Sequence, residues 1–311
     1  MFNKKISDNP ICLIFNTCFF GDVLLCNTLC QNLRKEYPNA KIVYIVDKPF
    51  FDVAKYQKDV DEVIIYDKKG ENKGFCGMLK FIKNFPYKNA DMSFVIYRNE
   101  RNIIISKLLG AKRILFRDKK CTATVQEEHA NLLSKVTKKP IENFPIKYEI
   151  AKEIPASLKE LVTEGENYIA LCTVSKDVIK DCPIETAVDL INQINSKGIN
   201  NKKYKVLFCG VGEKTKQYAE ALKRANCEFV DLINKTTIPE LAKVLRNCKA
   251  LVSVDTGTMH LGYALEVPTV CLFYKAGNSE FWAPNPEIYN VKILDNNITS
   301  NNIFDTLCGI L

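Results

Sequence analysis

The sequence predicts an α/β protein built from two doubly wound parallel sheets. Short apolar runs rich in β-branched residues alternate with segments of helical periodicity, which is typical of a parallel sheet covered on both faces. This alternation weakens near the middle of the chain and then restarts. The length of 311 residues also exceeds what a single core usually fills. We therefore expect two domains.

The first half of the sequence predicts one parallel sheet of this kind. The continuous apolar run at residues 11–15, followed by Asn16, indicates a strand buried on both faces. From Val23 the apolar residues change to helical spacing, and Pro38 ends that helix. The same alternation predicts strands at 11–16, 41–46, 60–66, 93–97 and 113–115, with helices at 23–37, 49–56, 77–85, 101–109 and 127–136.

A linker is expected between the two sheets. The segment around residues 137–155 contains three prolines and is rich in Lys and Glu. We place the domain boundary between residues 150 and 151. Beyond it the pattern predicts strands at 168–173, 205–209, 229–231, 250–254 and 269–273, with helices at 184–196, 214–224, 239–247, 259–265 and 301–311.

Composition limits the classes of function. The net charge of +8 is modest and spread along the chain, which favours an anionic ligand or an anionic membrane surface over a nucleic acid. None of the thirteen cysteines has the C-x-x-C spacing of a zinc or redox site, so we expect reduced core residues in the cytoplasm. No stretch is apolar for long enough to span a membrane.

Residues 251–274 are the first candidate for a binding site. An apolar strand ends at Asp255, and Gly257 follows at the start of a helix. The first amides of a helix have no partner within it, so small residues there admit a phosphate. Further donors come from three side chains, Thr256, Thr258 and His260. The alternative is that Asp255 or Thr256 only caps the helix and His260 packs in the core.

Other turns that follow strands are candidates too, because ligands of open parallel sheets bind beyond the carboxyl ends of the strands. Gly21 permits a tight turn that places Asp22 at the start of a helix, whose dipole favours the ionised carboxylate that a general base requires. Lys176 and Lys180 follow a strand of the second half and can reach an anion. The alternative for Asp22 is an ordinary carboxylate at the start of a helix, stabilised only by the helix dipole. The alternative for Lys176 and Lys180 is two solvated surface charges.

Three further patterns are weaker. The G-V-G-E run at residues 210–213 lacks the final glycine and the acidic residue of a dinucleotide fingerprint, so we exclude a nicotinamide site. Glu213 remains a candidate for ribose hydroxyls or a simple helix-start carboxylate. Asp59 and Asp61 form a D-x-D pair, but the strand follows the pair instead of leading into it, and the two histidines offer no zinc site. We expect no bound metal.

Four segments together resemble the motifs of glycosyltransferase family 9, the bacterial lipopolysaccharide heptosyltransferases. They are N-T-C-F-F-G-D-V-L at 16–24, S-K-D-V-I-K-D-C-P at 175–183, G-V-G-E at 210–213 and D-T-G-T-M-H-L at 255–261. The resemblance covers nearly the whole chain. It implies a GT-B-like fold of two facing doubly wound domains, with an acceptor-binding domain at 1–150, a nucleotide-sugar-binding domain at 151–311 and no required metal.

The resemblance also implies residue roles. Asp22 would be the general base, Lys180 would contact the donor phosphates and Glu213 the ribose. The remaining donor-binding residues would be Ser175, Asp255, Thr256, Gly257, Thr258 and His260. The chain departs from the family at five places. Members commonly have a basic residue where Asn16 stands, serine where Phe19 stands and proline where Thr28 stands. They commonly have tryptophan in place of Cys182 and Gly-Pro-Thr in place of residues 274–278.

The function predicted on this basis is inverting, metal-independent transfer of a heptose or similar sugar from a nucleotide-diphosphate sugar, with ADP-heptose as one candidate. The acceptor would be lipopolysaccharide core or another surface glycan, as a glycolipid or oligosaccharide. We expect no cofactor and no nucleic acid partner. The predicted location is cytoplasmic, with peripheral contact at the inner face of the inner membrane left open. The alternatives are a non-catalytic nucleotide-sugar-binding protein and a nucleotide-sugar epimerase or hydrolase on the same fold.

Overall fold

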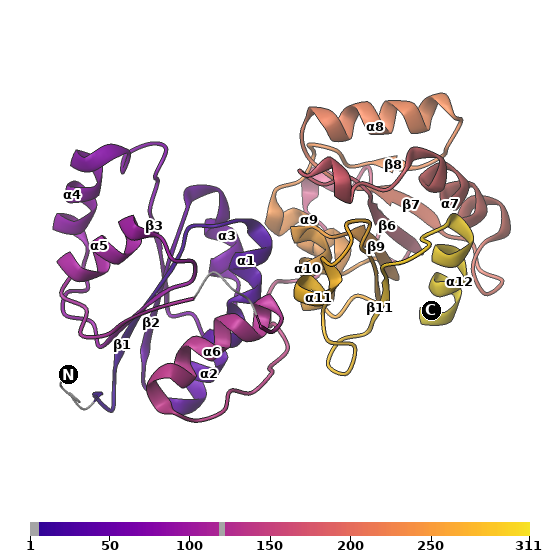
Figure 1. Ribbon diagram of the computed structural model, residues 1–311. Coiled ribbons are helices and arrows are strands. Elements are labelled where there is room, and N and C mark those ends of the chain that lie inside the picture. Colours follow the sequence, from indigo (N-terminus) through magenta and orange to yellow (C-terminus); the bar gives the residue numbers. More distant parts are fainter. Residues whose placement is uncertain (1–5, 118–121) are drawn as a thin grey trace. The chain divides into compact units, whose positions relative to one another are not determined.

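The structure, a computed structural model, describes residues 6–117 and 122–311 (Figure 1). The chain divides into two compact units, Met1–Lys147 and Tyr148–Leu311. Each unit is built around its own parallel sheet with helices on both faces, which confirms the predicted fold class. Within the described residues, none of the helices combines the length and the apolar character needed to cross a membrane.

The first unit contains a five-stranded sheet in the order β3-β2-β1-β4-β5. Both neighbours of β1 run parallel to it. The chain leaves β1 toward one edge and then returns to its other side, so β1 and β4 flank the topological switch point, where ligands of such sheets bind. The strands are β1 (Ile11–Asn16), β2 (Lys41–Val46), β3 (Glu62–Ile65), β4 (Met92–Val95) and β5 (Ile114–Phe116).

Two helices, α4 (Gly74–Asn84) and α5 (Glu100–Leu108), share one core with this sheet and lie together on one of its faces (Figure 1). The other face is covered by α1 (Phe20–Leu25), α2 (Asn27–Glu36), α3 (Phe51–Lys55) and α6 (Val125–Thr137), with the 3-10 turn η1 (Lys48–Phe50) before α3.

The single helix predicted at residues 23–37 is wrong, because Cys26 separates two helices. The side chain of Asn27 explains the break. It donates a 2.8 Å hydrogen bond to the carbonyl of Lys58 and accepts one of 2.8 Å from the amide of Lys147. The start of α2 is therefore fixed by contacts with segments that are distant in sequence.

The predicted linker is not a free connector. Up to residue 147 it packs on the first unit, where the Asn32 side chain exchanges two 2.9 Å hydrogen bonds with the backbone of Glu142. Beyond that point it packs on the second unit, where Asn247 donates a 2.7 Å bond to the carbonyl of Lys152. The change between units falls after Lys147, close to the predicted boundary at 150.

The second unit contains a six-stranded sheet in the order β11-β10-β9-β6-β7-β8, with its switch point between β6 and β9. The edge strand β11 was not predicted. The strands are β6 (Tyr168–Cys172), β7 (Lys205–Phe208), β8 (Val230–Asp231), β9 (Ala250–Val254), β10 (Thr269–Leu272) and β11 (Val291–Leu294).

The helices of the second unit also cover both faces of its sheet. One core is shared by α7 (Ile184–Lys197), α8 (Glu213–Arg224) and α12 (Ser300–Ile310). The other helices are α9 (Ile238–Leu245) and α10 (Gly257–Ala264), which contact each other, and the short α11 (Ser279–Trp282), η2 (Ala156–Leu158) and η3 (Val178–Lys180).

Candidate active site

In the first unit, the turns after β1 and β4 meet at the switch point. Asp22 lies in the first turn of α1, directly after β1, and Tyr97 follows β4. The Tyr97 hydroxyl donates a hydrogen bond to Oδ1 of Asp22. The candidate base is therefore held in place by a residue that the sequence analysis did not identify.

The environment of Asp22 differs from the expected one. Its side chain is almost fully buried, and burial raises the pKa of the carboxyl above its ordinary value. The hydrogen bond from Tyr97, a backbone hydrogen bond from Phe19 and the charge of Arg117 act in the opposite direction. The prediction that the helix dipole keeps this carboxylate ionised is therefore incomplete, because burial, the largest influence on this pKa, opposes ionisation. A raised pKa brings a carboxyl closer to the range useful for a general base.

Arg117 and His129 complete the surroundings of Tyr97. The guanidinium of Arg117 lies 3.9 Å from the centre of the Tyr97 ring, and the His129 ring meets that ring edge to face at 6.0 Å. Arg117 is buried, and its Nε and Nη1 have no hydrogen-bond partner among the described residues. His129 is fully buried, which lowers its pKa well below the ordinary value and keeps it neutral. The positive charge beside Asp22 therefore comes from Arg117.

The two departures expected to affect acceptor binding, Asn16 and Phe19, have different structural consequences. Asn16 is fully buried, and its Nδ2 donates to the carbonyl of Asp22 at 2.9 Å and to the Tyr44 hydroxyl at 3.1 Å. It therefore fixes the turn that carries Asp22. Phe19, at the start of α1, is 64% exposed. An aromatic side chain thus projects from the turn that precedes the candidate base.

In the second unit, the helix after β9 begins without a side-chain cap. Thr256 is the N-cap residue of α10, but its side chain makes no capping hydrogen bond. Its hydroxyl lies instead 3.3 Å from that of Ser253 and 3.8 Å from the sulfur of Cys172. Asp255 does not cap the helix either, since its carboxylate binds other side chains. The first amides of α10 therefore keep their capacity to bind an anion.

Lys180 and Asp255 meet at this turn, as two predicted donor-binding residues. Nζ of Lys180 lies 2.6 Å from Oδ2 of Asp255, and the side chain of Asn278 donates to the same oxygen. The ammonium group also lies 5.9 Å from the centre of the Trp282 ring. The loop after β6 thus brings a cation to the turn after β9, across the switch point of the sheet.

His260 is buried in α10, three residues after the turn. Its Nδ1 lies 2.6 Å from the Tyr263 hydroxyl. Burial lowers the pKa of His260 to about 4, with the charge of Asp255 acting in the opposite direction. The ring is therefore neutral near pH 7. If Tyr263 donates to Nδ1, Nε2 carries the proton and is available as a donor.

Gly257 and Thr258 are the first two residues of α10. Two further predicted donor residues, Ser175 and Glu213, lie at the same edge of the sheet. Ser175 shapes the loop after β6, because its hydroxyl donates to the carbonyl of Asp177 at 2.6 Å and accepts from the Asp177 amide. Glu213 is exposed at the start of α8, after β7. Gly212, which precedes it, has a φ of 91°, a conformation that favours glycine. β9, β6 and β7 are neighbours, so these turns follow adjacent strands.

The D-x-D pair has a structural explanation. Asp61 accepts two 2.8 Å hydrogen bonds from Arg34 and one of 2.6 Å from the amide of Ile42. Asp59 lies 3.8 Å from the same guanidinium. Both carboxylates stand just before β3, at the amino edge of the sheet and away from Asp22.

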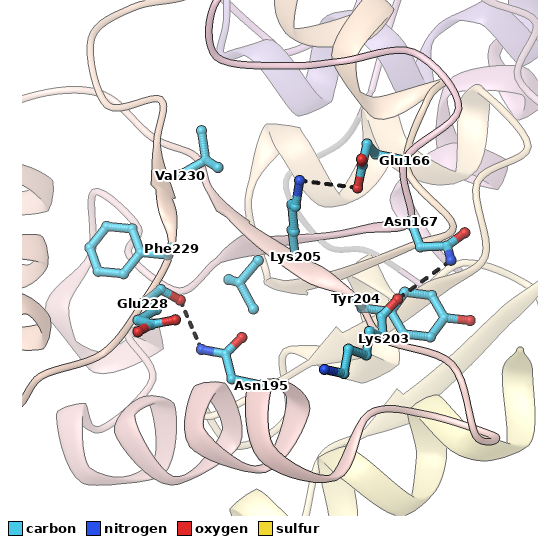
Figure 2. Close-up of a pocket in the computed structure, with 10 residues that line it drawn as sticks. Glu166, Asn167, Asn195, Lys203, Tyr204, Lys205, Glu228, Phe229 and Val230 are labelled. Atoms are coloured by element: carbon cyan, nitrogen blue, oxygen red, sulfur yellow. Dashed lines mark hydrogen bonds and ion pairs between the residues drawn. The ribbon is translucent and has the colours of Figure 1, made fainter.

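A surface pocket of about 400 Å³ lies away from the predicted residues (Figure 2). It is lined by residues at the amino ends of β7 and β8, the opposite edge from the turns that carry the predicted donor-binding residues. Its polar groups already bind one another: Lys205 pairs with Glu166 at 3.1 Å, and Asn195 donates to the carbonyl of Glu228 at 2.9 Å. This pocket is not part of the candidate site.

Comparisons with known proteins identify the family of the chain. The chain matches the model of glycosyltransferase family 9 (heptosyltransferase) over residues 108–303. It is 22% identical over 291 residues to lipopolysaccharide heptosyltransferase 3 of Escherichia coli, covering 86% of this chain and 84% of that protein.

Two solved structures are similar to the chain as a whole. A family 9 glycosyl transferase from Veillonella parvula has a TM-score of 0.86 and 20% identity, covering 99% of both chains. The E. coli heptosyltransferase WaaC, solved with ADP, has a TM-score of 0.76 and 18% identity, covering 97% of this chain and 100% of that one. At these identities the structures show a shared GT-B fold, while the family model matches more than half of the chain. The chain therefore belongs to glycosyltransferase family 9 and is a glycosyltransferase.

Proposed function

We propose that the protein transfers a heptose or similar sugar from ADP-heptose to a hydroxyl of lipopolysaccharide core or another surface glycan, with inversion and without a metal ion or cofactor. Relatives support the substrate classes: one is named a lipopolysaccharide heptosyltransferase, and WaaC is solved with ADP and with ADP-2-deoxy-2-fluoro heptose. The observation that carries the proposal is the uncapped start of α10 with Lys180 held beside it.

In this proposal the second unit binds the leaving group. The diphosphate lies at the first amides of α10, and Lys180 contacts it. Negative charge grows on the diphosphate as its bond to the sugar breaks, so fixed donors aimed there stabilise the transition state more than the ground state. Asp255 and Asn278 orient Lys180 before the donor arrives. Neutral His260 contributes a hydrogen bond and no charge.

The first unit supplies the base. Asp22 takes the proton of the acceptor hydroxyl while that oxygen bonds to the anomeric carbon, and ADP leaves with the electrons of the broken carbon–oxygen bond. Direct displacement inverts the anomeric configuration. A protein that only binds nucleotide sugars has no need of a buried carboxylate, because ionising Asp22 in this environment costs free energy. The pairing of Asp22 with Tyr97 and Arg117 therefore favours catalysis.

A transfer assay tests this function directly. The protein is incubated with ADP-heptose and heptose-deficient lipopolysaccharide, with UDP- and GDP-sugars as controls, and the product linkage is read by NMR. We expect acceptor-dependent release of ADP and a product of inverted anomeric configuration. ADP release that is independent of acceptor would indicate a hydrolase, and ADP binding without turnover on any acceptor would indicate a binding protein.

A further inference from the structure

Large apolar side chains are exposed on the outer sides of α4 and α5. On α4, Phe75 is 69% exposed and Leu79 is 42% exposed. On α5, Ile104 is 44% exposed and Leu108 is 56% exposed. Single exposed apolar residues are common on soluble proteins, but four on two neighbouring helices form a patch of the kind that marks an interaction site.

The fold directs these four side chains the same way. Both helices lie on one face of the first sheet (Figure 1), and residues of their inner sides, such as Phe81 of α4 and Ile105 of α5, belong to its core. Ile104 stands between two buried isoleucines, so helical geometry alone turns it outward. The outer sides of both helices therefore point away from the sheet. We call this surface the α4–α5 face; it comprises Phe75, Leu79, Lys80, Lys83, Ile104, Lys107 and Leu108.

The net positive charge of the chain lies in the segment that contains both helices. Residues 68–113 contain eleven Lys and Arg against three Asp and Glu, a net charge of +8. The whole chain also carries +8, so the rest of the sequence is neutral. The expectation that the charge is spread along the chain is therefore wrong. Lys80, Lys83 and Lys107 are exposed, and none of them forms an ion pair within the described residues.

We propose that the α4–α5 face docks on a bilayer containing anionic phospholipids. The apolar side chains enter the boundary between head groups and acyl chains, and the lysines contact lipid phosphates. Apolar anchors beside unpaired lysines are the combination that binds such surfaces. The role of this docking rests on the proposed function, because docking would bring the enzyme to an acceptor anchored in a membrane.

Charge and chemistry favour lipid over two other occupants. In a symmetric dimer through this face, the same surface of both copies would meet, and two segments of net charge +8 would repel each other. Binding of single-stranded nucleic acid uses aromatic side chains on which bases stack, but three of the four exposed apolar residues are aliphatic. Duplex binding relies on contacts with phosphates and gives no role to four exposed apolar side chains.

Vesicle binding by charge variants is the first test. The full-length protein is sedimented with phosphatidylglycerol–phosphatidylcholine vesicles and with pure phosphatidylcholine vesicles. We expect binding only to the anionic vesicles, weakening as salt increases. Because one Lys near such a surface contributes about fivefold in affinity, Lys80→Glu with Lys83→Glu should lose on the order of 25-fold or more. The matched control, Lys159→Glu with Lys249→Glu, makes the same charge change in the second unit and should lose much less.

The apolar side chains need a separate variant, because charge alone would also bind anionic vesicles. Phe75→Gln with Leu108→Gln should weaken binding by roughly tenfold or more at unchanged charge. Val178 and Val211 of the second unit are 71% and 70% exposed, so Val178→Gln with Val211→Gln is the matched control for vesicle binding. Circular dichroism confirms that each variant is folded.

Three outcomes would overturn the proposal: equal binding to neutral vesicles, face variants that bind like the wild type, or a dimer in sedimentation that these variants abolish. Transfer to a soluble oligosaccharide acceptor is measured in parallel and should be unaffected in the face variants. If the wild type docks but transfers no sugar, the proposed function fails and the docking proposal stands. If it transfers sugar but does not dock, only the docking proposal fails.

Discussion

At the scale of single residues, the main addition of the structure is the contact between Tyr97 and Asp22. The two residues are 75 positions apart, and only the strand order places β4 beside β1. Sequence patterns locate turns after strands, but they do not state which turns meet. For the same reason Asn278 was not predicted, although it follows β10 as Asp255 follows the neighbouring β9.

Removing the Tyr97 hydroxyl should shift the pH dependence of transfer. Its hydrogen bond lowers the pKa of Asp22, so Tyr97→Phe should raise that pKa further. The base acts when ionised, and activity is lost as pH falls through its pKa. The acid limb of the kcat/KM profile should therefore move to higher pH, with activity recovering at high pH. Tyr87→Phe is the matched control, since Tyr87 donates to the carboxylate of Glu62 elsewhere in the unit. An unchanged acid limb in Tyr97→Phe would exclude this role.

At the scale of elements, strand positions were predictable and some boundaries were not. Buried parallel strands such as β1 and β9 are apolar runs with one polar residue each, so the sequence identifies them directly. β11 is a partly exposed edge strand of four residues that includes Lys292. So short a run with a charged residue cannot be told from a loop by its sequence pattern. The break at Cys26 depends on the tertiary hydrogen bonds of Asn27, which local periodicity does not reveal.

The start of α10 can be tested through its first residue. In the proposed function a phosphate lies against the backbone at Gly257, so a branched side chain there should obstruct it. We expect Gly257→Val to weaken ADP binding by about tenfold or more, equivalent to about 1.4 kcal/mol. Gly309→Val in α12 is the control, because a Cβ at Gly309 meets open space. Titration calorimetry gives both affinities. Equal affinity for ADP in the wild type and in folded Gly257→Val would place the diphosphate elsewhere.

At the scale of the whole molecule, the sequence indicated two units and the residues at the carboxyl edges of their sheets. It did not show that the connecting segment packs on both units, because its contacts come from side chains of α2 and the α9–β9 turn. It also does not determine the environment of Asp22, where burial raises the pKa of the carboxyl. Burial depends on the packing of several segments, which no single motif encodes.

The proposed reaction does not require a metal ion, and this can be tested on the complete transfer reaction. The D-x-D carboxylates are engaged with Arg34, and the proposed cation at the diphosphate is Lys180. We therefore expect full transfer activity in excess EDTA, measured as acceptor-dependent ADP release. Loss of activity that manganese restores would show that the reaction uses a metal ion. If Asp59→Ala lost activity in the same way, that ion would belong to the D-x-D pair.

The central claim is that the first unit supplies the base and the second unit binds the donor diphosphate. It is tested most directly by comparing Asp22→Asn and Lys180→Ala for both ADP-heptose affinity and single-turnover transfer. Asp22→Asn should keep the affinity and lower the rate by about two to four orders of magnitude. Lys180→Ala should lose affinity and lower the rate on the order of a hundredfold. Asp52→Asn, the same change in the first turn of α3, serves as control. More than a tenth of wild-type activity in Asp22→Asn, or unchanged affinity and rate in Lys180→Ala, would contradict this account.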